Sequence, residues 1–122
     1  MPRKILIADD EPSILVSTAM LLRDFGYEVV TCSAADAIVA TLEKETPDLL
    51  LQDVRMPGLD LEKLVLSLRG DARWAMLPIV IFSASMDLDD IHRRVGAAGM
   101  LEKPFKPHEL VAALDEALGL AA

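Results

Sequence analysis

Short apolar runs alternate along the chain with longer stretches in which apolar residues recur at helical spacing. The runs at 4–8, 28–32, 48–53, 78–84 and 100–103 are almost continuously apolar and predict β-strands. The stretches at 13–26, 34–45, 59–70, 88–99 and 107–119 predict amphipathic helices. Gly26, Pro47 and Gly70 stand at or just beyond the ends of the first three stretches, where such residues stop a helix.

Strict alternation of strands and helices predicts a parallel sheet with helices on both faces. The apolar runs are continuous rather than alternating, which is typical of parallel strands that are buried on both sides. The predicted architecture is therefore an α/β fold, a three-layer α/β/α sandwich. Because the chain has 122 residues and no linker-like segment, we expect residues 1–122 to form a single domain.

Polar side chains stand where these strands end. Ligands of parallel α/β sheets bind outside the carboxyl ends of the strands, so side chains delivered there share one edge. The strand ends supply Asp9, Asp10 and Glu11, then Cys32 and Ser33, then Asp53, then Ser83, and finally Lys103. The sequence thus predicts that carboxylates, a hydroxyl and an ammonium group gather at this edge.

Each of these residues also has an ordinary explanation. The three acids could be charges near the start of a helix, since Pro12 follows them and acids near a helix N-terminus are stabilising. Asp53 could cap a turn, Ser83 could be a strand-end hydroxyl, and Lys103 could be solvated. Their common placement on strand ends of one edge favours a functional site instead.

Clustered carboxylates raise one another's pKa unless a cation neutralises them. Carboxylate oxygens suit Mg²⁺, which takes one or two carboxylates and leaves positions for phosphate oxygens. Lys103 can neutralise a phosphoryl group, Ser83 can donate a hydrogen bond to it, and an aspartate such as Asp53 can accept it as an aspartyl phosphate. Positioning and charge neutralisation are the main requirements of phosphoryl transfer.

The composition narrows the classes of partner. A net charge of −8 argues against binding of this domain to nucleic-acid phosphates. Cys32 is the only cysteine, so no intrachain disulfide can form. The N-terminus lacks the apolar region of a signal peptide, and no run approaches the ~20 apolar residues of a membrane span. We expect a cytoplasmic protein without membrane contacts.

Four motifs occur in the order "ILIADDEP", "LLLQDVRMPGLD", "PIVIFSAS" and "AAGMLEKPF". With them the chain resembles the receiver domain of bacterial two-component response regulators, from Lys4 to about Leu118. The resemblance implies a flavodoxin-like five-stranded parallel sheet in the order 2-1-3-4-5. It also implies a phosphorylatable signalling switch that catalyses only its own phosphotransfer and dephosphorylation, rather than an enzyme.

The resemblance assigns roles to individual residues. Asp53 matches the phospho-acceptor, Ser83 the switch hydroxyl and Lys103 the lysine that contacts the phosphoryl group, with a cis bond to Pro104. The implied cofactor is Mg²⁺, bound by Asp10 directly, by Asp9 through water, by Asp53, and by the backbone carbonyl of Arg55. The implied phosphoryl donor is a sensor histidine kinase or a phosphotransfer protein.

The implied response is a change in the face made by the fourth helix, fifth strand and fifth helix, which controls a downstream effector domain or protein. The resemblance also allows a phosphorylation-linked homodimer. Two positions depart from the family. Met100 replaces the usual aromatic residue three positions before the lysine, and Leu61 replaces a frequent glycine. Methionine is flexible, so the aromatic half of the switch should be altered.

Two other functions would use some of the same residues. A Mg²⁺-dependent phosphatase with an aspartyl-phosphate intermediate usually has a second acid two residues after its nucleophile, where this chain has Arg55. A flavodoxin-like cofactor binder needs a small, polar phosphate loop where this chain has "ADDEP". His92 and His108 lie in helical patterns and do not look like phospho-donors, and Trp74 is expected to pack over the third helix.

Overall fold

The computed structural model describes residues 2–84, 91 and 96–120. Its strands are β1 (Lys4–Ala8), β2 (Glu28–Cys32), β3 (Leu49–Asp53), β4 (Ile79–Ser83) and β5 (Gly99–Glu102). Its helices are α1 (Pro12–Asp24), the short 3₁₀ helix η1 (Ala35–Ala37), α2 (Ile38–Glu45), α3 (Leu61–Arg69) and α5 (Pro107–Ala117). The helix expected at 88–99 falls largely on residues outside the described ranges.

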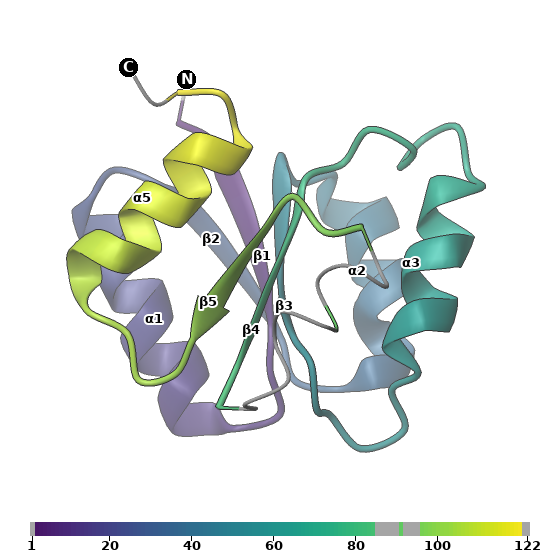
Figure 1. Ribbon diagram of the computed structural model, residues 1–122, viewed down its shortest axis with the longest axis horizontal. Coiled ribbons are helices and arrows are strands. Elements are labelled where there is room, and N and C mark those ends of the chain that lie inside the picture. The colour runs from purple at the N-terminus through teal and green to yellow at the C-terminus, as the bar shows by residue number, and fades with distance from the viewer. Residues whose placement is uncertain (1, 85–90, 92–95, 121–122) are drawn as a thin grey trace.

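The strands form one parallel sheet in the order β2-β1-β3-β4-β5. In Figure 1, α1 and α5 cover one face of this sheet and α2 and α3 cover the other. The expected three-layer, flavodoxin-like fold is therefore confirmed. The central strands β3 and β4 are buried along their whole length, whereas β2 and β5 at the sheet edges have exposed residues. The interior strands β1, β3 and β4 contain the uninterrupted apolar runs 5–8, 49–51 and 79–82, as expected for parallel strands covered on both faces.

Each face of the sheet has its own apolar core. On the α2 and α3 side, strand residues such as Leu6, Leu50 and Ile81 pack with Leu42, Val65, Leu68 and Trp74. On the α1 and α5 side, strand residues such as Ile7, Leu51 and Phe82 pack with Leu15, Leu22, Leu110 and Leu114. Trp74 packs over the third helix as expected, and it is 6% exposed.

The helix boundaries differ from the pattern by a few residues, for local reasons. The segment 34–45 does not form one helix: it begins with the 3₁₀ turn η1, in which the Ala37 amide bonds the Ala34 carbonyl. Helix α3 begins at Leu61 rather than at residue 59, because the Asp60 carboxylate caps it by accepting from the Lys63 amide at 3.1 Å. Gly26, which has a positive φ of 92°, follows α1 as expected.

Within the described residues, no helix is both long and apolar enough to cross a membrane.

Candidate functional site

The carboxyl ends of the strands, at the lower edge of the sheet in Figure 1, surround a cleft of about 510 Å³. We call it the acidic cleft. It is lined by Asp9, Asp10, Glu11, Ile14, Asp53, Arg55, Ser83, Ala84, Lys103 and Pro104. Every residue proposed from the sequence for metal or phosphoryl binding is in this set, whereas Cys32 and Ser33 are not. The parallel register explains the gathering, since Asp53 stands opposite Phe82 and Ser83 opposite Glu102.

The neighbouring acids at the end of β1 have different environments. Asp9 is 1% exposed, whereas Asp10 and Glu11 are exposed. One carboxylate oxygen of Asp9 accepts a hydrogen bond from the Glu11 amide at 2.9 Å. None of the three acids lies within the first turn of α1, but Glu11 is the N-cap residue of that helix, so the ordinary explanation still applies to Glu11. A buried carboxylate such as Asp9 needs a compensating positive charge.

Lys103 supplies that charge. Its Nζ lies 2.7 Å from Oδ2 of Asp9 and 3.5 Å from Oδ1 of Asp53, so one ammonium bridges two buried carboxylates. The ammonium also lies 4.4 Å from the centre of the Phe82 ring, which is a cation–π contact. The Lys103 amide donates to the Ser83 carbonyl at 2.9 Å, and the Lys103–Pro104 bond is cis, as the resemblance implied.

The pKa of Asp53 is raised to about 6. The largest cause is burial of the carboxylate, and the second is the charge of Asp9. Lys103 and a backbone hydrogen bond from Arg55 oppose the rise but do not cancel it. Asp53 is therefore largely ionised at pH 7, but its negative charge is poorly compensated.

The three aspartates can meet one cation. Carboxylate oxygens of Asp9, Asp10 and Asp53 all lie within 4.8 Å of one another. This donor set consists of hard oxygens, two of them from buried side chains, and it carries more negative charge than Lys103 can neutralise. Such a set fits Mg²⁺ or a similar oxygen-preferring cation.

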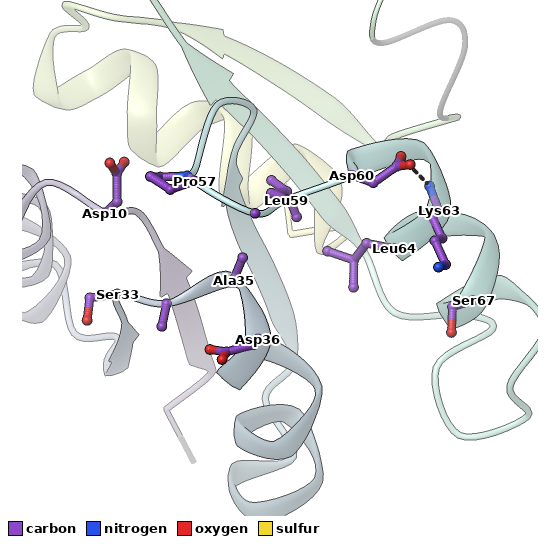
Figure 2. A pocket seen from close by; sticks show the side chains of 12 residues that line it. Asp10, Ser33, Ala35, Asp36, Pro57, Leu59, Asp60, Lys63, Leu64 and Ser67 are labelled. Atoms are coloured by element: carbon purple, nitrogen blue, oxygen red, sulfur yellow. Dashed lines mark hydrogen bonds between the residues drawn. The ribbon is translucent and has the colours of Figure 1, made fainter.

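A wider pocket, of about 640 Å³, opens beside Asp10. It lies between residues 33–36, which follow β2, and the segment from Pro57 to Ser67 (Figure 2). Asp36 lines it from one side and Lys63 from the other. Because Asp10 lines both this pocket and the acidic cleft, the two hollows adjoin at this residue.

Two residues of the site were not proposed from the sequence. Phe82 supports Lys103 from within β4, and Gln52 places a buried amide directly before Asp53. Phe82 could not be found from the pattern, because it looks like any other apolar strand residue. Gln52 could have been noticed as the one amide in the otherwise apolar run "LLLQ". His108 is exposed on α5 and does not line the acidic cleft, and His92 falls outside the described residues.

Known proteins share both the sequence pattern and the fold. The family model of the response regulator receiver domain matches residues 5–115. The transcriptional regulatory protein PdtaR of Mycobacterium tuberculosis is 36% identical over an alignment of 124 positions, which covers 97% of this chain and 58% of that protein. The chain spans 58% of the length of PdtaR, 24% of the length of the regulator NtrC of Klebsiella pneumoniae and 46% of the length of the regulator PhoP of Bacillus subtilis. These relatives therefore contain further segments.

Solved structures give the same answer. A putative response regulator from Chloroflexus aurantiacus superposes with a TM-score of 0.90 at 30% identity, covering 98% of this chain and 99% of that one. The receiver domain of the Pseudomonas aeruginosa sensor histidine kinase PA1611, solved with a magnesium ion in its active-site cleft, superposes with a TM-score of 0.86 at 27% identity, covering 98% of this chain and 99% of that one. The chain therefore belongs to the receiver domain family of two-component response regulators.

Proposed function

We propose that Asp53 accepts a phosphoryl group from a phosphohistidine of a sensor histidine kinase or a phosphotransfer protein. The observation that carries the proposal is the placement of three aspartates within 4.8 Å of one another, with the Lys103 ammonium 3.5 Å from Asp53. A carboxylate oxygen of Asp53 would attack phosphorus while the phosphorus–nitrogen bond to the histidine breaks. The imidazole then leaves with the electron pair of that bond.

The metal in this proposal is Mg²⁺, held by Asp9, Asp10, Asp53 and the backbone carbonyl of Arg55. The magnesium ion of the PA1611 receiver and the oxygen donor set of this cleft both support the assignment. When bound, Mg²⁺ supplies positive charge against which the carboxylates and phosphoryl oxygens can approach. The residues of this chain do the rest: they place the nucleophile and bind the transferred group.

Ser83 and Lys103 are the proposed phosphoryl ligands. Both line the acidic cleft with Asp53, and Ser83 is 3% exposed at the end of β4. When Asp53 carries a phosphoryl group, the Lys103 ammonium must divide its charge between that group and Asp9. We infer that this redistribution is transmitted through β4 and β5 to the surface of β5 and α5. The fourth helix expected at 88–99, which belongs to the same proposed face, falls largely outside the described residues.

The wider function follows from this role. We propose that residues 1–122 act as one receiver domain whose phosphorylated form controls an effector domain or protein in the cytoplasm, with a homodimer as an alternative phosphorylated assembly. Relatives such as the DNA-binding regulator NtrC and the phosphatase-synthesis regulator PhoP are transcriptional regulators, which supports an effector role in gene control. Direct binding of this acidic domain to nucleic acid is not part of the proposal.

The metal assignment is tested by unfolding the protein in urea with chelator and with Mg²⁺. A ligand that binds only the folded state adds about 2.7 kcal/mol at 100 times its Kd. Wild type should gain stability from Mg²⁺, and Asp10→Ala should lose most of that gain. Asp36→Asn, which changes an exposed acid of the neighbouring pocket, should keep it. Equal stabilisation of wild type and Asp10→Ala would refute the metal site.

A further inference from the structure

The side chain of Gln52 is completely buried in the apolar core, one residue before the proposed phospho-acceptor. Its exposed fraction is 0%. In the sheet it stands between Ala8 of β1 and Ile81 of β4, both of which belong to the core on the α2 and α3 side. Leu50, two residues earlier on the same face of β3, is an ordinary apolar member of that core. A primary amide at this depth requires an explanation.

The amide group bonds the segment that follows it. Its Nε2 donates to the backbone carbonyl of Asp53 at 2.9 Å and to Sδ of Met56 at 3.3 Å. Both partners are acceptors only, so the NH₂ group must be the part of the side chain that faces them. Met56 is 6% exposed and packs in the same core. Gln52 therefore fixes both ends of the short segment that contains Arg55.

These hydrogen bonds do not make the core more stable than an apolar residue would. Oε1 of Gln52 is buried and accepts no hydrogen bond from any residue within the described ranges. A buried acceptor without a partner lowers the stability of the folded state, and an apolar side chain of similar shape would avoid that loss. The amide is thus unfavourable for the core itself, and its two bonds act on the geometry of residues 53–56.

We propose that Gln52 is a positioning residue for the acidic cleft: it holds the Asp53 carbonyl and Met56 so that the Asp53 carboxylate and the Arg55 carbonyl are preset for the metal. The inference rests on the proposed function, because it assigns Gln52 to the same metal and phosphoryl site. It goes beyond that function because Gln52 lies in the core on the α2 and α3 side of β3, whereas the side chain of the next residue, Asp53, points to the other side. Groups that orient metal ligands typically change metal affinity by 10–100-fold when they are removed.

The test replaces the amide with an apolar side chain of similar length, Gln52→Met. The matched control is Leu50→Met, which makes a comparable core change on the same strand and face without touching a hydrogen bond. Three quantities are measured for each: unfolding in urea with chelator, amide hydrogen exchange of Val54 and Arg55 with chelator, and Mg²⁺ affinity by calorimetry. The Val54 amide reports on the loop because it donates to the Phe82 carbonyl at 3.2 Å.

Gln52→Met should be at least as stable as wild type, yet exchange its Val54 and Arg55 amides faster and bind Mg²⁺ about 10-fold more weakly. Leu50→Met should leave the exchange rates and the affinity unchanged. Met56→Leu, which removes only the sulfur acceptor, should shift both in the direction of Gln52→Met by a smaller factor. This variant also provides the test if Gln52→Met does not fold.

The inference would be overturned if Gln52→Met exchanged its Val54 and Arg55 amides and bound Mg²⁺ as wild type does. Gln52 would then be only a core residue, whether or not the substitution lowered stability. A wild-type protein that does not bind Mg²⁺ would instead refute the proposed metal site. In that case the metal-free exchange of Val54 and Arg55 still decides whether Gln52 positions the loop.

Discussion

The ammonium group of Lys103 is bound more closely to Asp9 than to Asp53: the two nitrogen–oxygen distances are 2.7 Å and 3.5 Å. The lysine that we expect to bind the phosphoryl group is therefore engaged, before phosphorylation, with an acid proposed to bind the metal. Asp9 is 1% exposed and the Lys103 side chain is 18% exposed, so this is a largely buried pair. The same lysine thus serves as the internal counter-ion of the acidic cleft.

Removing this counter-ion should destabilise the metal-free protein and increase its response to Mg²⁺. In Lys103→Ala the buried charge of Asp9 loses its partner, and breaking such pairs costs about 3 kcal/mol of unfolding free energy. Mg²⁺ should restore much of this loss, because a cation can then neutralise the carboxylates without competing with the ammonium. Urea unfolding with chelator and with Mg²⁺ measures both effects. Lys63→Ala, at an exposed lysine of α3, is the control, and an equal Mg²⁺ gain in both variants would contradict the account.

The raised pKa of Asp53 predicts how stability depends on pH. The folded-state pKa of about 6 lies above the ordinary aspartate value of 3.8, so the folded protein holds this proton more tightly than the unfolded chain. The stability linked to Asp53 is therefore greatest at acid pH and is lost as the pH rises through about 6. Between pH 4.5 and 7.5 the loss should be about 2 kcal/mol.

Asp53→Asn isolates this contribution, because asparagine does not titrate. In chelator, wild type should lose unfolding free energy relative to Asp53→Asn as the pH rises from 4.5 to 7.5, so the variant becomes the relatively more stable protein at the higher pH. A difference that stays constant over this range would mean that Asp53 has an ordinary pKa in the folded protein.

Met100 predicts a weaker conformational response than is usual in the family. Its side chain is 40% exposed on β5, where most receivers have an aromatic ring. A flexible thioether fills space in many ways, so its position should follow Ser83 less strictly than a ring does. Chemical-shift mapping with beryllofluoride, a phosphoryl mimic, should show small changes over residues 88–99, β5 and α5 in wild type and larger changes in Met100→Tyr. Met76→Tyr, at a side chain that is 90% exposed, is the control. Shifts confined to the acidic cleft in both proteins would contradict this readout.

Arg55 should lengthen the life of the aspartyl phosphate. It is exposed and lines the acidic cleft two residues after Asp53, where a guanidinium group can contact phosphoryl oxygens or Glu11 and crowd the approach of water. Arg55→Ala should dephosphorylate faster, by less than about tenfold, since an exposed contact supplies at most ~1 kcal/mol. Arg3→Ala, at an exposed arginine before β1, should decay like wild type. An unchanged rate in Arg55→Ala would make it a solvated arginine, and a slower one would mean that it assists the attack.

The fold, and the set of residues that line the acidic cleft, could be predicted from the sequence because both depend on repeated, local features. Continuous apolar runs predict buried parallel strands, and the residues that end those strands share one edge whatever their detailed contacts. That is why Asp9, Asp53, Ser83 and Lys103 could be expected in one cleft although Lys103 is 94 residues away from Asp9.

What depends on tertiary contacts could not be predicted in this way. Nothing in "ADDEP" indicates that Asp9 is buried while Asp10 is exposed. The burial of Asp9 depends on the packing of β1 between β2 and β3, which are distant in the sequence. The preference of Lys103 for Asp9 over Asp53 depends on side-chain reach across the cleft. The bonds of Gln52 and the ring contact of Phe82 likewise depend on packing between elements.

The most direct test of the central claim is the intact mass of the protein after incubation with acetyl phosphate and Mg²⁺. Wild type and the exposed-acid control Asp36→Asn should each gain the mass of one phosphoryl group with Mg²⁺ and none with chelator. Asp53→Asn should gain none under either condition, because its amide cannot form the acyl phosphate. A stable phosphoryl group acquired by Asp53→Asn at a rate comparable to wild type would show that Asp53 is not the acceptor.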